Sequence, residues 1–174
     1  MRTAYAITWL LAVAVAFGLA PPNRPDLWPW LARLLTGDWA GENPLVVAHF
    51  QMMGLWPLAM AALWRKEWRR SGRLPAWPFL LGGFALGCFA ILPYAALRRD
   101  RTLGAPGAPA WAWALLAIGF AGFLAWGLAA GDAAGWLAAV RTDGFMWPMA
   151  WDFALFAGLF AVESRGRLWG ANGG

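Results

Sequence analysis

Few side chains in this chain of 174 residues are equipped for chemistry. The sequence holds one histidine, His49, and one cysteine, Cys88, and Asp152 is the carboxylate well inside an apolar run, FMWPMAWDFALFAGLF. A single cysteine excludes an internal disulfide and any site that needs several cysteine ligands. No glycine-rich phosphate loop, nucleophile motif or His/Glu zinc pattern occurs. The sequence therefore predicts no catalytic site and no metal site.

His49 stands near the start of an apolar stretch, with Met52, Met53 and Trp56 at neighbouring positions of a helix. An imidazole in this setting could ligate the metal of a haem or chlorophyll, and the 15 tryptophans of the chain offer surface for carotenoid or chlorin rings. The alternative is a histidine at the membrane interface, bonded to a carbonyl or to water. One histidine excludes a bis-histidine haem within the chain.

Placing the Asp152 carboxylate in hydrocarbon costs about 2.5–3.5 kcal/mol on insertion scales, so the side chain should face protein or water. One interpretation is a proton or ion pathway, and the other is a structural anchor paired with an arginine. Arg65, at the end of the second apolar run, can extend its side chain toward Asp152. A lone acid makes a poor proton relay, so we expect a structural Asp152–Arg65 ion pair.

Composition places these residues in a bilayer, because 61% of the chain is hydrophobic and only 13% is charged. Soluble domains carry about 45–50% apolar and about 25% charged residues. Apolar runs of about 20 residues recur, which is the length a helix needs to cross the hydrocarbon core. The net charge of +5 comes from short clusters at the ends of these runs, where arginines meet lipid headgroups. We therefore expect membrane lipids and no nucleic acid as partners.

The predicted fold is an all-α bundle of about five transmembrane helices with one short interfacial helix, forming a single domain over residues 1–174. Pro21 and Pro22 suit signal cleavage poorly, so the first apolar run is expected to stay as a span. The interfacial helix falls around Leu27–Leu35. The expected spans are 4–20, 45–63, 78–97, 111–130 and 146–162.

The connections carry most of the charge. We expect a basic loop over 65–73, an irregular Gly/Pro link over 101–110, a short surface helix over 136–140 and a mobile tail over 165–174. Five spans place the termini on opposite sides and divide the 14 lysines and arginines seven to seven. This tie leaves the orientation open, and the dense 65–73 loop favours a cytoplasmic position for that side.

Proline and small residues predict how the helices bend and pack. Pro57 and Pro93 fall inside spans, where a missing N–H should kink the helix. Small residues four positions apart allow close approach of two helices, within the chain or between subunits. These pairs are Gly83 with Gly87, Ala125 with Ala129, and Gly127 with Gly131.

Four blocks carry a resemblance: NPLVVAHFQMMGLWP, PAWPF, LPYAALR and MAWDFALF. In this order and spacing they resemble an uncharacterised family of small polytopic membrane proteins of cyanobacteria and chloroplasts. The likeness covers residues 44–98 and 145–165, and it departs from the family in the basic 65–73 loop. It implies a link to photosynthetic or related energy-converting membranes and transfers no catalytic residue.

Together these features favour a non-catalytic accessory or assembly subunit of a larger membrane complex, in a bacterial plasma membrane or a thylakoid-type membrane. It would contact other membrane subunits, lipid, and a pigment such as chlorophyll, carotenoid or haem. One alternative is a small proton- or ion-coupled carrier or channel that uses Asp152. A weaker alternative is a membrane enzyme acting on lipid or isoprenoid substrates.

Overall fold

The computed structural model describes residues 2–65, 74–98 and 108–168, and side chains as far as Arg165. Over these ranges the chain forms eight helices and no strand, which confirms the all-α class. The helices are α1 (Arg2–Gly18), α2 (Leu27–Thr36), α3 (Pro44–Trp64), α4 (Trp77–Leu86), α5 (Cys88–Leu97), α6 (Ala110–Ala130), α7 (Ala133–Thr142) and α8 (Met146–Leu168). The basic loop beyond Arg65, most of the Gly/Pro link and the last six residues of the predicted tail lie outside the described residues.

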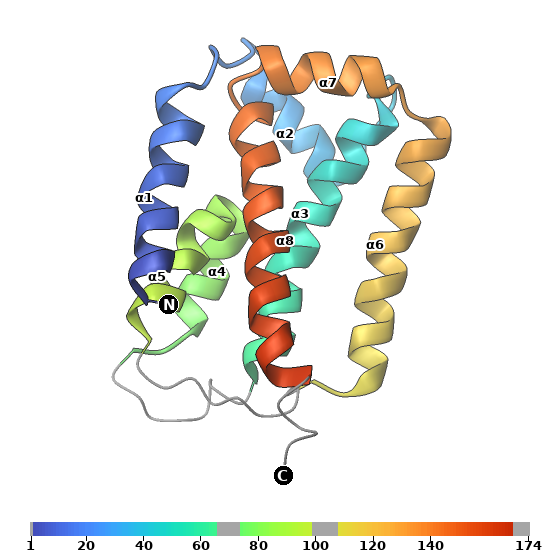
Figure 1. Cartoon of the computed structure of the whole chain (residues 1–174). Coiled ribbons are helices and arrows are strands. Elements are labelled where there is room, and N and C mark those ends of the chain that lie inside the picture. Colours follow the sequence, from blue (N-terminus) through green and yellow to red (C-terminus); the bar gives the residue numbers. More distant parts are fainter. Residues whose placement is uncertain (1, 66–73, 99–107, 169–174) are drawn as a thin grey trace.

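Four helices, α1, α3, α6 and α8, run along the length of the molecule, while α7 lies across one end and α2 runs obliquely beside the half of the bundle nearest to that end (Figure 1). We call the end that α7 crosses the cap end, and the opposite end the base. The amphipathic helix expected near Leu27–Leu35 is α2, which buries Trp30 and Leu34 and exposes Trp28 and Leu35.

Two helices, α3 and α6, are long and apolar enough to cross a membrane, with 21 residues each. The pair α7 and α8 qualifies together as a third candidate, although the two helices meet at a bend of 106°. The helices α1, α4 and α5 are apolar but shorter. The described residues thus contain two or three candidate spans, which is consistent with a membrane protein, and a bundle of about five spans is not confirmed.

The span predicted over 78–97 is instead a helical hairpin made of α4 and α5. The two helices are antiparallel, since the rings of Phe79 and Tyr94 lie 5.4 Å apart and a Cβ on Gly83 would come within 2.7 Å of the Ile91 side chain. Both open ends of the hairpin point to the base, and its tip stops part of the way along the bundle (Figure 1). Ten residues of helix are about 15 Å long, half of the hydrocarbon thickness, so each arm is too short to cross.

Two groups of buried side chains form the core. The base group centres on Trp64, Ile91 and Phe156, which are fully buried where α3, α5 and α8 meet. The cap group joins Trp30 of α2 to Val47 of α3 and to the start of α8. The hairpin therefore packs into one half of the bundle, while α2 closes the other half.

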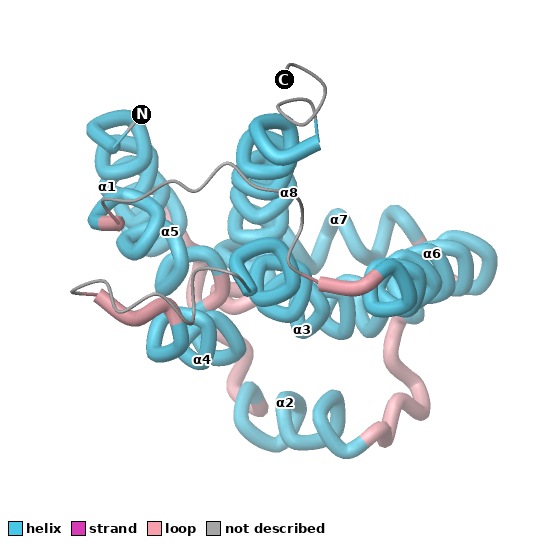
Figure 2. The backbone as a smooth tube through the Cα atoms, turned by 90° about the horizontal axis from the view of Figure 1, so that it is seen from below, coloured by secondary structure: helices cyan, strands magenta, loops and turns pink. Residues whose placement is uncertain are grey.

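Helix α6 stands at the edge of the bundle beside α3 (Figure 2). Its contact with α3 runs through Gly127 and Gly131, where an added Cβ would come within 2.8 Å of Ala48 and 2.7 Å of the Leu45 nitrogen respectively. This pair packs within the chain, as the spacing of small residues allowed. The predicted packing pair Ala125 and Ala129 is exposed on the outer face and has no such role within the chain.

The predicted kinks fall inside continuous helices. Pro57 lies within α3, which runs unbroken to Trp64, and Pro93 lies within α5. The bend angles at these prolines stay a prediction. Helix α8 continues to Leu168 and so includes the first part of the tail expected over 165–174.

Candidate functional site: a helical hairpin held by two acids

Asp152 is 3% exposed on α8 and lies against the tip of the hairpin. Its Oδ1 accepts a hydrogen bond of 2.6 Å from the backbone N–H of Cys88, and the N–H of Phe89 lies near the carboxylate. These are the first residues of α5, whose N–H groups have no partner within the helix. Asp152 therefore caps α5 from a different helix, and the positive end of the α5 dipole favours a carboxylate there.

Gly87 makes this contact possible. Its φ of 60° is a conformation that glycine adopts readily and side-chain-bearing residues do not. A Cβ at this position would lie 1.6 Å from Oδ2 of Asp152, which is far inside van der Waals contact. The sequence suggested Gly87 as part of a helix-packing stripe with Gly83. The structure places Gly83 in the packing against Ile91 and Pro57, and Gly87 at the turn.

The other end of α5 is held by a second acid on the same helix. Arg98 follows the last residue of α5 and forms a buried ion pair with Glu163. The hydroxyl of Tyr5 on α1 donates to Glu163 at 2.6 Å, and the Arg98 guanidinium lies 4.8 Å from the centre of the Trp64 ring on α3. Four helices thus meet around one ion pair at the base.

The spacing of the two contacts matches. Asp152 and Glu163 are eleven positions apart on α8, and their partners are ten positions apart, Cys88 as the first residue of α5 and Arg98 just after its last. At 1.5 Å per residue these separations are about 16 Å and about 15 Å, so two parallel helices can bond at both ends. Asp152 and Glu163 together hold α5 against α8.

Apolar side chains separate the two acids. Phe156 and Leu159 lie between them on the same face of α8 and are 0% and 4% exposed. Apolar side chains thus occupy the face of α8 between the two acids. This arrangement suits holding a neighbouring helix at two separate points.

The predicted ion pair between Asp152 and Arg65 is not among the contacts of Asp152 in the described part of the chain. The carboxylate is bonded to backbone donors instead. The physical reason is the hairpin, because a break in an apolar run creates a helix N-terminus in the core that an acid can satisfy without an arginine. The structural-anchor interpretation of Asp152 agrees with this geometry, but the partner differs.

His49 is 6% exposed and packs among aromatic rings. Its Nδ1 accepts a hydrogen bond of 3.2 Å from the indole of Trp136, and its ring meets Phe153 edge-on at 5.2 Å. Its Nε2 is buried and forms no hydrogen bond of standard geometry, with the Met149 carbonyl as its nearby acceptor. The contact with Trp136 was not foreseen, and the role as a tetrapyrrole ligand stays a prediction.

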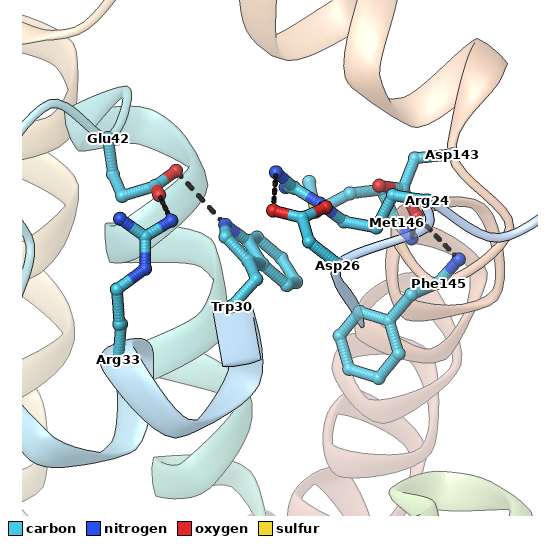
Figure 3. A network of polar contacts seen from close by, with 8 residues as sticks. All are labelled: Arg24, Asp26, Trp30, Arg33, Glu42, Asp143, Phe145 and Met146. Carbon is cyan, nitrogen blue, oxygen red and sulfur yellow. Dashed lines mark hydrogen bonds and ion pairs between the residues drawn. The ribbon is translucent and has the colours of Figure 1, made fainter. Parts of the chain in front are cut away.

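The cap end carries a separate network of polar side chains (Figure 3). Arg24 bonds Asp26 at 2.7 Å and lies 4.5 Å over the Trp30 ring. The hydrogen bond from Arg24 holds the pKa of the Asp26 carboxyl below its ordinary value. Glu42 joins two groups of α2, accepting from Arg33 at 2.6 Å and from the Trp30 indole at 3.0 Å. This network fixes α2 and the loop after it over the start of α3.

Some of these functional residues carried a usable signal in the sequence. Glu163 follows Asp152 by about three helical turns, so both acids fall on one face of α8. Arg98 was the matching positive charge, because it follows the apolar run that contains α5. The break at Gly87 gave no signal in the sequence, because the apolar run continues on both sides of it. No group of three or more His, Cys, Asp or Glu side chains suited to a metal occurs among the residues described.

Comparison of the chain with protein-family models, curated proteins and solved structures gives no match. The argument about function therefore rests on the geometry of the chain itself.

Proposed function

We propose that the protein is an integral membrane protein in which α1, α3, α6 and α8 cross the bilayer and the α4–α5 hairpin re-enters it from the base. The direction of the helices supports this topology, because α1, α3, α6 and α8 run lengthwise while α7 lies across one end (Figure 1). Non-crossing backbone at membrane depth is tolerated where protein buries it, and Asp152 satisfies the hairpin at its tip.

This topology also favours one of the two orientations that the sequence left tied. With four crossings both termini lie at the base, and the lysines and arginines divide eleven to three instead of seven to seven. The positive-inside rule then places the base in the cytoplasm. The three at the cap end are Arg24, Arg33 and Arg141. The eleven belonging to base-side ends and connections are Arg2, Arg65, Lys66, Arg69, Arg70, Arg73, Arg98, Arg99, Arg101, Arg165 and Arg167.

Its function, in this proposal, is that of a non-catalytic accessory or assembly subunit of a larger membrane complex. The observation that carries the proposal is the use of both core acids, Asp152 and Glu163, in holding α5. An exposed apolar face on α6 gives a partner or lipid a place to bind, with Trp111, Leu115, Ile118 and Leu128 all more than 60% exposed.

Gentle extraction tests this function. The natively expressed protein, solubilised in a mild detergent and separated by size under native conditions, should migrate with other membrane proteins as a larger particle. Mass analysis identifies the partners, and an absorption spectrum of the same fraction tests the predicted pigment contact. Migration as a single colourless chain at every detergent concentration would contradict the proposal.

A second candidate, an ion-coupled carrier, is favoured by one specific observation. An acid meets the N-terminus of a broken helix inside the bundle, and carriers build substrate sites from discontinuous helices of this kind. Purified protein in liposomes tests it with Asp152→Asn. Lost ion flux with an unchanged unfolding transition would favour the carrier over the accessory subunit. Gly158→Ala on α8 is the control, because nothing lies within 4 Å of the added methyl group.

A further inference from the structure

Helix α7 forms the outer wall of a cavity of about 450 Å³ at the cap end. Gly135 and Ala139 line the cavity from α7, and Trp30, Val46 and Met146 line it from α2, α3 and α8. No residue of α7 is itself buried, because the helix packs against the cap group along one face and leaves the other face open. Helix α7 therefore covers the cavity without a buried side chain of its own to anchor it.

Two polar contacts tie α7 to α3 in the described part of the chain. At the start of α7, the Asn43 side chain donates to the Asp132 carbonyl at 2.7 Å and accepts from the Asp132 N–H at 3.1 Å. Near the middle of α7, the Trp136 indole donates to Nδ1 of His49 at 3.2 Å. An amide does not titrate, whereas an imidazole changes its charge between about pH 5 and pH 8. Of these two contacts, the one at His49 is therefore the one that acid can break.

The Trp136 contact defines the protonation state of His49. An indole N–H donates and cannot accept, so Nδ1 must offer a lone pair and the imidazole must be neutral, with its proton on Nε2. Nε2 lies near the Met149 carbonyl of α8, which suits a proton at that atom. A second proton, on Nδ1, would place two donors face to face and remove the hydrogen bond. The observed position of α7 therefore requires a neutral His49.

The other ionisable groups on the surrounding helices do not pair with His49. Helix α3 carries no ionisable side chain besides His49, and α6 carries none. Those of α7, α8 and their flanking turns are Asp132, Arg141, Asp143, Asp152, Glu163, Arg165 and Arg167. Within the described ranges none of the four acids forms an ion pair with His49, and each accepts a hydrogen bond from another group. A proton on Nδ1 would therefore gain no carboxylate partner to replace the lost hydrogen bond.

We infer that α7 is an acid-released lid, held over the cap-end cavity while His49 is neutral and freed when His49 takes up a second proton. Opening gives His49 contact with water, which hydrates the imidazolium. Because the closed lid excludes this proton, the open population should rise up to about tenfold for each pH unit below the pKa of a free histidine, about 6.5. The lid depends on the fold alone, and the proposed topology adds that it responds to acid outside the cytoplasm.

Thiol accessibility on the two faces of α7 tests the lid in the purified full chain. In a Cys88→Ala background, Ala139→Cys places a thiol against the cavity, and Ala138→Cys places one on the exposed face as the matched control. The reagent is a dipyridyl disulfide, which reacts with thiols at acidic as well as neutral pH. The ratio of the two labelling rates, cavity face over exposed face, should rise about tenfold between about pH 7.5 and about pH 5.5. A ratio that stays constant over this range would overturn the proposal.

His49→Gln separates the imidazole from every other titrating group. Its side-chain oxygen can accept from the Trp136 indole at any pH, so the ratio should keep its neutral-pH value as the solution is acidified. Asp152 and the acids at the ends of α7 are unchanged in this variant. A rise that persists in His49→Gln would assign the effect to those acids and overturn the proposal.

Trp136→Phe removes the donor instead of the acceptor. The ratio should then be raised already at neutral pH, because the contact with His49 is lost. Trp111→Phe, on the exposed face of α6, is the control for the loss of an indole. Equal ratios in these two variants would show that the contact does not hold α7. Unfolding curves at both pH values show whether labelling occurs in the folded chain, as the proposal requires.

Discussion

Asp152 contributes to the fold because its carboxylate accepts the Cys88 N–H at the start of α5. Asp152→Ala leaves this buried N–H without its acceptor, and an orphaned donor costs about 1–3 kcal/mol. We expect the free energy of unfolding to fall by about 1–3 kcal/mol. Asp152→Asn keeps one acceptor oxygen and should lose less than half as much. Unfolding in a graded detergent–dodecyl sulfate mixture measures both, and equal losses would show that the cap is not the source of stability.

Gly87 permits this cap. Gly87→Ala forces a methyl group into the space of the Asp152 carboxylate and strains a backbone with φ of 60°. The expected loss in unfolding free energy is about 2 kcal/mol or more, combining the backbone strain with the displaced acid. Gly158→Ala should instead be neutral or stabilise by about 0.5–1 kcal/mol, since a helical glycine there meets open space. The same unfolding assay measures both variants. A Gly87→Ala variant with an unchanged free energy of unfolding would contradict the described turn.

At the scale of an element, the hairpin is the part of the fold that depends on distant residues. Glu163 and Arg98 should couple in a double-mutant cycle of Glu163→Gln and Arg98→Met. Breaking one partner of a buried ion pair costs about 3–5 kcal/mol, while the double variant should cost less than the sum by about 1 kcal/mol or more. Strictly additive effects would mean that the two side chains do not act as a pair.

The packing of α6 gives a matched comparison on one helix. Gly127→Leu should destabilise strongly, because even a Cβ at this position would come within 2.8 Å of Ala48 on α3. Ala125→Leu, on the exposed face, should change the unfolding free energy by less than about 0.5 kcal/mol. Unfolding curves in the same detergent measure both variants. Similar effects at the two positions would contradict the placement of α6.

Sequence patterns predicted these elements unequally. The long helices α3 and α6 follow from apolar runs of the right length, and α2 follows from its one-sided apolar pattern. The hairpin does not, because α4 and α5 are apolar all round and together have the length of one span. Only the turn at Gly87 and its contact with Asp152, which lies far away in the sequence, break the run. The sequence therefore predicted only part of the candidate site. Asp152 stood out as an acid within an apolar run, while its backbone partner and the role of Glu163 became visible only in the tertiary fold.

At the scale of the whole molecule, the proposed topology differs from a bundle of five spans in the number of crossings, and hence in the side on which each segment lies. A continuous span over 78–97 puts the segments before α4 and after α5 on opposite sides of the membrane. The hairpin puts both at the base, together with the end of α8, and opposite to the loop between α2 and α3 (Figure 1). In the proposed topology most lysines and arginines then fall on the base side, in agreement with the positive-inside tendency.

Cysteine labelling in intact cells tests this topology most directly. In a Cys88→Ala background, single cysteines are introduced as Leu74→Cys before α4, Ala108→Cys before α6, and Asp38→Cys after α2. The account predicts that a membrane-impermeant maleimide labels Asp38→Cys from outside, and labels Leu74→Cys and Ala108→Cys only after the cells are permeabilised. Labelling of Leu74→Cys and Ala108→Cys from opposite sides of the membrane would contradict the re-entrant hairpin.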